Sequence, residues 1–190
     1  MNVSNQHTLV SEFVVEGVGL HTGLQSVMTV KPASPGHGIK FQRVDVAGQP
    51  TLKADVDFVV DTSRGTTLEH NGARVATVEH ILAALTGMGV DNALIQLTAE
   101  EVPIMDGSSK EFVAAIEKVG IEEQDAKKIY FSIDTNISFV DEEKNVEMVA
   151  TPSTEYKITT MIDFNSNVLG TQHAYLKGLS SFRKEIAPCR

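Results

Sequence analysis

Cysteine is almost absent from this 190-residue chain, since the only one is Cys189, beside the C-terminal Arg190. A single thiol excludes a disulfide framework within the chain and a cysteine-based zinc cluster. Long apolar runs are missing as well, because no stretch approaches the ~18 consecutive apolar residues that span a bilayer. The first residues carry neither the basic segment nor the apolar core of a secretory signal. We therefore expect a soluble, cytoplasmic protein.

Runs of positive charge are also missing. Lys and Arg total 16 against 25 Asp and Glu, for a formal net charge of −9, and basic residues are adjacent only at 127–128 and 183–184. Such a chain is a poor candidate for binding nucleic acid or an anionic membrane face. Its hydrophobic content of 42% is ordinary for a globular protein and sufficient for a core. The length allows one domain or two small ones.

Local patterns predict many strands and few helices. Alternating β-branched residues between turn signals predict strands in residues 8–17, 26–32, 39–46 and 92–100, and Asn71–Gly72 predicts a hairpin turn. One helix is expected after Thr77, whose hydroxyl would be its N-cap, and a left-handed glycine at 87 or 89 would end it. A second helix would follow Ser108 or Ser109. Apolar positions recur at helical spacing at Val78, Ile81, Leu82, Leu85 and Met88, and at Phe112, Val113, Ile116 and Val119.

The polar run at residues 122–128 indicates a domain boundary. We assign residues 1–125 to a first α+β domain and residues 126–190 to the N-terminal part of a second. The second region has strand patterns at 128–134, 136–141, 145–151 and 156–164, but only one short helix pattern at 180–188. A sheet needs another layer to cover it. We therefore expect this region to be incomplete and to expose apolar side chains.

Two titratable residues, Glu79 and His80, stand at the start of the first predicted helix. In the simplest interpretation Glu79 interacts with the positive end of the helix dipole, worth roughly 0.3–1 kcal/mol, and His80 is a partly buried histidine. In the functional interpretation both side chains border one cavity, His80 holds a metal ion and Glu79 takes a proton from water. The His-Glu-x-x-His signature is absent, and the spacing alone does not decide.

A zinc site needs further ligands, because catalytic zinc takes three protein ligands and keeps one position open. His21 follows a glycine-rich stretch at 17–23 that predicts a turn, so it lies either on the surface or at a cavity. His70 precedes the Asn71–Gly72 turn and is expected to be exposed, while His173 lies in a stretch with a loop-like composition. None of them forms a convincing pair at helical ligand spacing.

Six stretches, in order and spread over nearly the whole chain, resemble one enzyme family. They are "GVGLHTG" (17–23), "DTSRGTTL" (61–68), "TVEHILAAL" (77–85), "GVDNALIQL" (89–97), "EVPIMDGSS" (101–109) and "MIDFN" (161–165). The family is UDP-3-O-acyl-N-acetylglucosamine deacetylase, the zinc enzyme of lipid A biosynthesis in Gram-negative bacteria. The stretch after residue 161 is most similar to the form fused to a (3R)-hydroxyacyl-carrier-protein dehydratase.

This resemblance implies two α+β domains with their helices sandwiched between two sheets. It makes Glu79 the general base and His80 a zinc ligand. It places Phe164 against the uracil of the substrate, with Asp163 beside it, and His21 near the active site. "DTSRGTT" would line the approach to the zinc, whereas Asp106 of "MDGSS" would be structural. The cofactor would be Zn²⁺ and the substrate UDP-3-O-(3-hydroxyacyl)-N-acetylglucosamine, whose N-acetyl group is hydrolysed at the committed step.

Other parts of the family pattern do not occur in these 190 residues. The remaining zinc ligands, in a His-Lys-x-x-Asp motif, a catalytic histidine and an oxyanion-stabilising threonine would all lie beyond Arg190. The resemblance therefore implies an N-terminal part of the enzyme that is inactive alone. Two alternatives stay open: a self-contained zinc hydrolase that uses His80 with His21, His70 or His173, and a non-catalytic binding module in which Glu79 and His80 only support a helix.

Overall fold

The computed structural model describes residues 4–190, which form two compact units. One unit holds the chain up to Lys128 together with Leu179–Arg190, and the other holds Ile129–Gly178. Strands outnumber helices in the chain, which confirms the α+β class. The predicted division at residues 125 and 126 stays a prediction. In the structure the units divide at Lys128, and Leu179–Arg190 belongs with the first of them.

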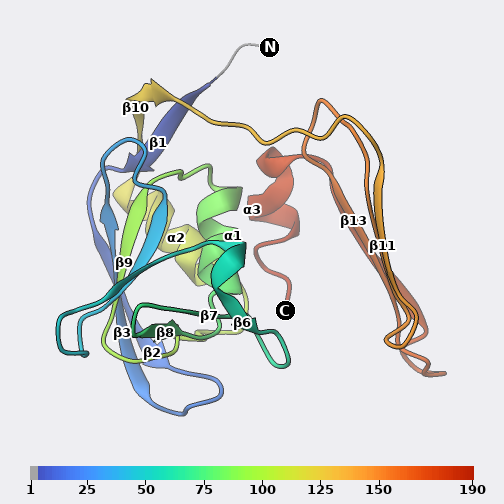
Figure 1. Cartoon of the computed structure of the whole chain (residues 1–190), viewed down its shortest axis with the longest axis horizontal. Helices are drawn as coiled ribbons and strands as arrows, with labels where there is room; N and C mark the ends of the chain where they lie inside the picture. The colour runs from blue at the N-terminus through green and yellow to red at the C-terminus, as the bar shows by residue number, and fades with distance from the viewer. Residues whose placement is uncertain (1–3) are drawn as a thin grey trace. The chain divides into compact units, whose positions relative to one another are not determined.

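A five-stranded sheet is the centre of the first unit (Figure 1). The strand order is β2-β3-β9-β4-β5, and all neighbours are antiparallel except β4 and β9. Buried and more exposed residues alternate along β3, so Ser26, Met28 and Val30 are buried on one face. The strands are β2 Phe13–Val18, β3 Gln25–Pro32, β4 Ile39–Arg43, β5 Thr51–Lys53 and β9 Ala93–Leu97.

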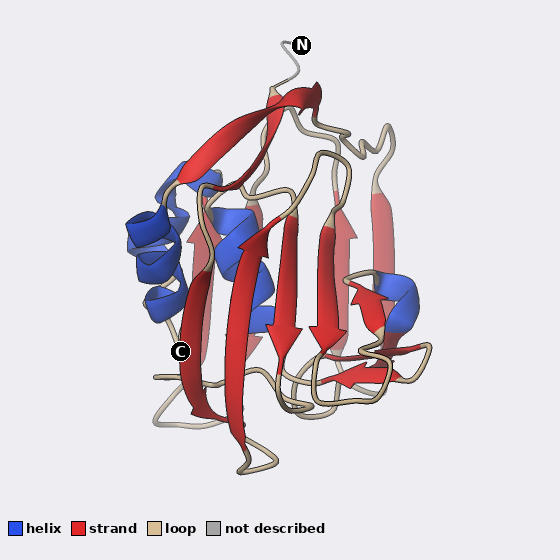
Figure 2. Cartoon of the chain, turned by 90° about the vertical axis from the view of Figure 1, so that its left-hand side faces the viewer, coloured by secondary structure: helices blue, strands red, loops and turns tan. Residues whose placement is uncertain are grey.

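Helices α1 (Glu79–Gly87) and α2 (Lys110–Val119) lie side by side against one face of this sheet (Figures 1 and 2). Both were predicted, and their apolar positions Ile81, Leu85, Phe112 and Ile116 are fully buried. Gly89, with φ 78°, follows the end of α1 in the left-handed conformation expected there. None of the described helices is long and apolar enough to cross a membrane.

A small antiparallel sheet leads into α1. It consists of β6 Val59–Asp61, β7 Thr67–His70 and β8 Ala73–Val75, and it follows the short 3₁₀ helix Val56–Phe58. The predicted hairpin turn joins β7 to β8, with Asn71 at φ 49° and Gly72 at φ 77°. Two positive φ angles are typical of the tight turns that match strand twist. The hairpin thus delivers the chain to the start of α1.

The polar run at residues 122–128 is not a linker. Residues Ile121–Lys127 form strand β10, which pairs antiparallel with β1 (Asn5–Leu9). Within β10, Gln124 and Ala126 are half-buried while their neighbours are exposed, and the Gln124 amide donates to the Ala33 carbonyl. Its polar composition conceals a two-residue alternation, because the partner strand lies near the other end of the sequence.

The second unit contains two antiparallel hairpins. β11 (Ile137–Asp141) pairs with β12 (Val146–Ala150), and β13 (Ile158–Asp163) pairs with β14 (Thr171–Leu176). The strand predicted at 128–134 is absent from this described region. β14 was predicted to be a loop. The expected exposed apolar side chains are present, among them Phe131, Phe139, Met148 and Met161.

The last residues, Leu179–Arg190, pack on the helices of the first unit. They form a 3₁₀ turn (Leu179–Ser181) and the short helix α3 (Phe182–Glu185). Phe182 is buried against Gly87 at the end of α1. The Ser109 N–H donates to the Ala187 carbonyl (3.0 Å), and Arg183 pairs with Glu117 of α2 (2.7 Å). This segment therefore joins the ends of both helices.

Candidate active site

A strained strand-to-helix turn brings Glu79 and His80 to the start of α1. Ala76, directly after β8, forms a parallel bridge with Glu101. Thr77 then takes φ 58°, and Val78 returns to helical angles as the N-cap residue. A positive φ is uncommon for a β-branched residue and is sustained only where surrounding contacts hold it.

Thr77 does not cap α1, which corrects the sequence prediction. Its hydroxyl donates to Oε1 of Glu101 (2.8 Å) in a buried contact, and the N-cap residue Val78 makes no side-chain cap bond. A hydrogen bond to a charged carboxylate is stronger than one from a neutral backbone N–H. The left-handed backbone of Thr77 turns its side chain toward that carboxylate. Ser109 likewise occupies the N-cap position of α2, but its hydroxyl donates to the His80 carbonyl (2.9 Å).

Glu79 is half-buried in the first turn of α1, as predicted, and its two carboxylate oxygens differ. Oε2 accepts the Thr66 N–H at 3.0 Å. Oε1 faces Gly65 so closely that a Cβ on that glycine would lie 3.1 Å from it. One oxygen is thus held by the backbone, and the other has no hydrogen bond within residues 4–190. The carboxylate is oriented with one oxygen left to accept a proton.

His80 is half-buried, and its ring has no hydrogen-bond or ion-pair partner in the part of the chain that the structure describes. Only its main chain is fixed, by the Ser109 hydroxyl. An imidazole without an internal partner, beside an oriented carboxylate, suits a metal ligand. Within residues 4–190, no three His, Cys, Asp or Glu side chains gather closely enough to hold a metal ion.

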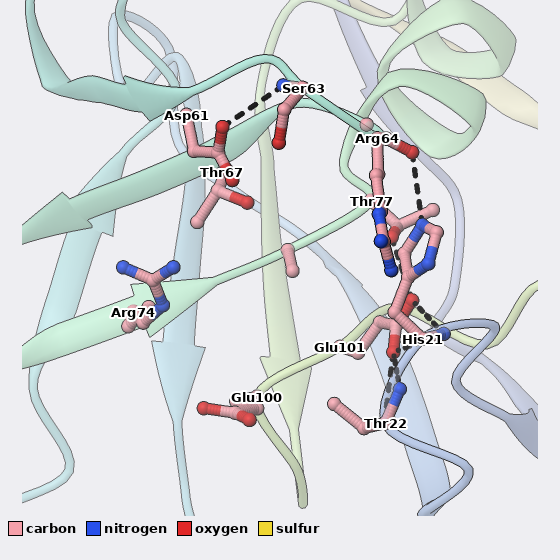
Figure 3. Close-up of a pocket in the computed structure, with 12 residues that line it drawn as sticks. His21, Thr22, Asp61, Ser63, Arg64, Thr67, Arg74, Thr77, Glu100 and Glu101 are labelled. Carbon is pink, nitrogen blue, oxygen red and sulfur yellow. Dashed lines mark hydrogen bonds between the residues drawn. The ribbon is translucent and has the colours of Figure 1, made fainter.

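His21 lies in the predicted glycine-rich turn and contacts the segment 64–66, here called the strap, which holds Glu79. Its Nε2 is 2.9 Å from the Arg64 carbonyl, so the tautomer protonated at Nε2 donates there (Figure 3). Arg64 immediately precedes Gly65 and Thr66, which touch Glu79. His21 is therefore brought to the same region as Glu79, although its own ring contacts the main chain and not the carboxylate.

Glu101 is the residue that sequence reasoning missed. Its carboxylate is buried and accepts the N–H groups of His21 and Thr22, at 3.1 and 2.8 Å, and the hydroxyls of Thr22 and Thr77 (Figure 3). Burial alone would raise the pKa of Glu101, but these hydrogen bonds outweigh it and lower the pKa below its usual range. No local signal distinguishes Glu101 from its neighbour Glu100, so only the fold reveals it.

A pocket of about 200 Å³ opens between the His21 turn, residues 63–65 and the small sheet (Figure 3). Part of the predicted "DTSRGTT" stretch lines it, and Asp61 orders that stretch by accepting the Ser63 N–H at 2.9 Å. Side chains of both signs of charge line it, over a surface that is largely carbon. The lining residues are His21, Thr22, Asp61, Ser63, Arg64, Gly65, Thr67, Arg74, Ala76, Thr77, Glu100 and Glu101.

The other candidate residues lie elsewhere. His70 is exposed, as predicted, and its ring stacks on Phe58 with centroids 4.1 Å apart. His173 lies in β14 of the second unit and is exposed. Asp163 and Phe164 stand at the end of β13 in that unit, where Asp163 accepts the Asn165 N–H and the Phe164 N–H donates to Gly170. Asp106 accepts both the N–H and the hydroxyl of Ser108, in keeping with the structural role expected for it.

The α+β fold, with an oriented carboxylate at Glu79 and an imidazole without a partner in residues 4–190 at the next position, suits a hydrolytic enzyme. Residues 6–190 match the family described as UDP-3-O-acyl N-acetylglycosamine deacetylase. The chain therefore belongs to this deacetylase family.

Curated relatives agree with this family. The chain is 44% identical over 187 residues to the UDP-3-O-acyl-N-acetylglucosamine deacetylase of Myxococcus xanthus. This alignment covers 98% of the chain and 59% of the relative. It is 42% identical over 185 residues to the bifunctional enzyme LpxC/FabZ of Bacteroides thetaiotaomicron. This alignment covers 97% of the chain and 40% of the relative. The chain thus spans between two fifths and three fifths of the length of these relatives. Single and bifunctional relatives match it about equally well.

Proposed function

We propose that this chain is part of a zinc-dependent deacetylase that hydrolyses the N-acetyl group of UDP-3-O-acyl-N-acetylglucosamine. Family membership supports the reaction class, and the relatives' names supply the substrate. The single observation that carries the proposal is the asymmetric hydrogen bonding of the Glu79 carboxylate, next in the sequence to a His80 ring that has no partner within residues 4–190. Support of a helix end alone requires neither feature.

Glu79 acts as the general base in this proposal. Its Oε2 is held by the Thr66 N–H, so Oε1 is the oxygen that takes the proton from the attacking water. A base that is oriented before the substrate arrives does not need to reorganise during the reaction. A Cβ at Gly65 would lie 3.1 Å from Oε1, so a side chain at that position would crowd the base.

His80 would hold the zinc ion through its ring, which suits this role because it is half-exposed and has no protein partner within residues 4–190. Zinc, when bound, would supply Lewis-acid polarisation of the amide and its water. His80 provides one of the three protein ligands that a catalytic zinc takes. We propose that residues outside this chain provide the others and that the chain alone has little deacetylase activity.

Phe164 and Asp163 are proposed to bind the uridine part of the substrate. Phe164 is 42% exposed, so one face of its ring is accessible for stacking on a pyrimidine. The Phe164 N–H donates to the Gly170 carbonyl, and Asp163 accepts the Asn165 N–H, so the loop that carries both residues is internally braced. These contacts support a fixed position for the ring.

Glu79→Gln in the full-length gene product tests the base, with Glu111→Gln as the matched control. Glu111 is an exposed acid in the first turn of α2, so both substitutions remove the same charge from the first turn of a helix. We expect kcat for acetate release to fall by about 10²–10⁴-fold in Glu79→Gln while zinc stays bound, and to be unchanged in Glu111→Gln. Equal, small effects of both would support the non-catalytic interpretation and refute the proposal.

A further inference from the structure

Glu101 is a buried carboxylate that binds only uncharged groups. Within residues 4–190 it has no ion-pair partner, and it accepts two N–H groups and two hydroxyls from the His21–Thr22 turn and from Thr77. A Cβ on Gly19 would lie 2.5 Å from its Oε2, so the turn closes directly over the carboxylate. A buried charge is costly unless neighbouring dipoles compensate it. Glu101 therefore fixes the position of every segment that donates to it.

The first of these segments leads straight into α1. Thr77 is buried, holds φ 58° and stands two residues before Glu79. Its hydroxyl bond to Glu101 and the backbone bridge between Ala76 and Glu101 are the contacts that hold this conformation. Unfavourable backbone angles persist only where the surroundings impose them. Loss of the Glu101 acceptor would let Thr77 relax and would rotate the start of α1.

The second segment reaches Glu79 through the His21 turn. Glu101 holds the His21 N–H, and the His21 ring contacts the Arg64 carbonyl at 2.9 Å. Two residues later, the Thr66 N–H donates to Oε2 of Glu79, and the Val78 N–H donates back to the Thr66 carbonyl. One carboxylate thus sets both the helix that carries Glu79 and the strap that orients it.

We propose that Glu101 is a positioning residue for the Glu79 base. It acts through Thr77, and through His21 and the strap. This inference rests on the proposed function only for its kinetic consequence. The structural consequence, a weaker hydrogen bond from Thr66 to Glu79, can be measured without activity.

The first test is amide hydrogen exchange of this chain by NMR. In Glu101→Gln and in Thr77→Val, exchange at the Thr66 N–H should accelerate by about tenfold. Thr77→Ser keeps the donating hydroxyl and should restore protection. Ile95→Val, on the central strand β9, removes one buried methylene away from the turn and controls for general loss of stability. Thr77→Val decides the question if Glu101→Gln does not fold.

The second test is steady-state kinetics of the same variants in the full-length gene product. Misplacement of the base should lower kcat by about 10-fold to 100-fold in Glu101→Gln and Thr77→Val, with KM changed little and with Thr77→Ser close to wild type. Unchanged exchange at Thr66 in both variants would overturn the positioning role, whatever their kcat. Accelerated exchange with unchanged kcat would keep the positioning role and would instead refute Glu79 as the base.

Discussion

Whether Gly87→Ala raises or lowers the free energy of unfolding depends on the packing of the last twelve residues. Gly87 ends α1, and a Cβ built on it would overlap the Phe182 ring, which is only 4% exposed. Alanine at a helical position is favoured over glycine by about 0.8–1 kcal/mol. Forcing a methyl group into a packed contact costs typically 1–3 kcal/mol. We therefore expect the overlap to win and the free energy of unfolding to fall by up to about 2 kcal/mol.

In the Phe182→Ala background, Gly87→Ala should have the opposite effect on stability, which a double-mutant cycle measures. Phe182→Ala alone should cost about 3–5 kcal/mol, since it removes a buried aromatic ring. In that background the space beside Gly87 is open, so Gly87→Ala should stabilise by about 0.5–1 kcal/mol through helix propensity. The coupling between the two sites is thus on the order of 2 kcal/mol.

Urea unfolding followed by the helical circular dichroism signal is the suitable assay. The α-helices all lie in the first unit, whereas the three tyrosines lie between Tyr130 and Tyr175 in the second unit. Helical dichroism therefore reports the first unit, and tyrosine fluorescence reports the second. A stabilising Gly87→Ala in the wild-type background would refute the packing of Phe182 on α1.

Two further predictions concern charged groups. The Glu101 carboxylate, whose pKa is held below its ordinary value of 4.5, stabilises the folded chain above that pH, and this contribution is lost as the pH falls through the folded-state pKa. The stability gap between wild type and Glu101→Gln, measured by urea unfolding, should therefore narrow below about pH 4.5, and a constant gap would contradict this. Arg43 makes a two-point contact with Asp45 and donates to the Arg74 carbonyl, so Arg43→Lys should cost about 1–3 kcal/mol by the same assay, whereas a loss under ~0.5 kcal/mol would contradict the geometry.

Elements with strong local signals were predicted from the sequence. The apolar spacing of α1 and α2 and the Asn71–Gly72 turn are set by neighbours a few residues apart, and the structure confirms them. The position of Glu79 and His80 in the first turn of α1 follows from the same periodicity. These predictions succeed because local and tertiary preferences agree.

The failures come from contacts between distant segments. Strand β10 looks like an unpaired polar run until β1 supplies its ladder, and residues 128–134 have a strand pattern but form no strand. Thr77 has the right residue type for an N-cap, but the Glu101 carboxylate takes its hydroxyl. Glu101 itself gives no sequence signal, because burial and four donors from two other segments define it. Propensity rules contain no information on such partners.

The most direct test of the account is the zinc content of purified full-length protein after single histidine substitutions. His80→Ala should lose the metal, whereas His70→Ala and His173→Ala should keep the wild-type amount, since His70 stacks on Phe58 and His173 is exposed on β14. Undiminished zinc in His80→Ala, or loss of zinc in either control, would contradict the assignment of His80 as the metal ligand beside the Glu79 base.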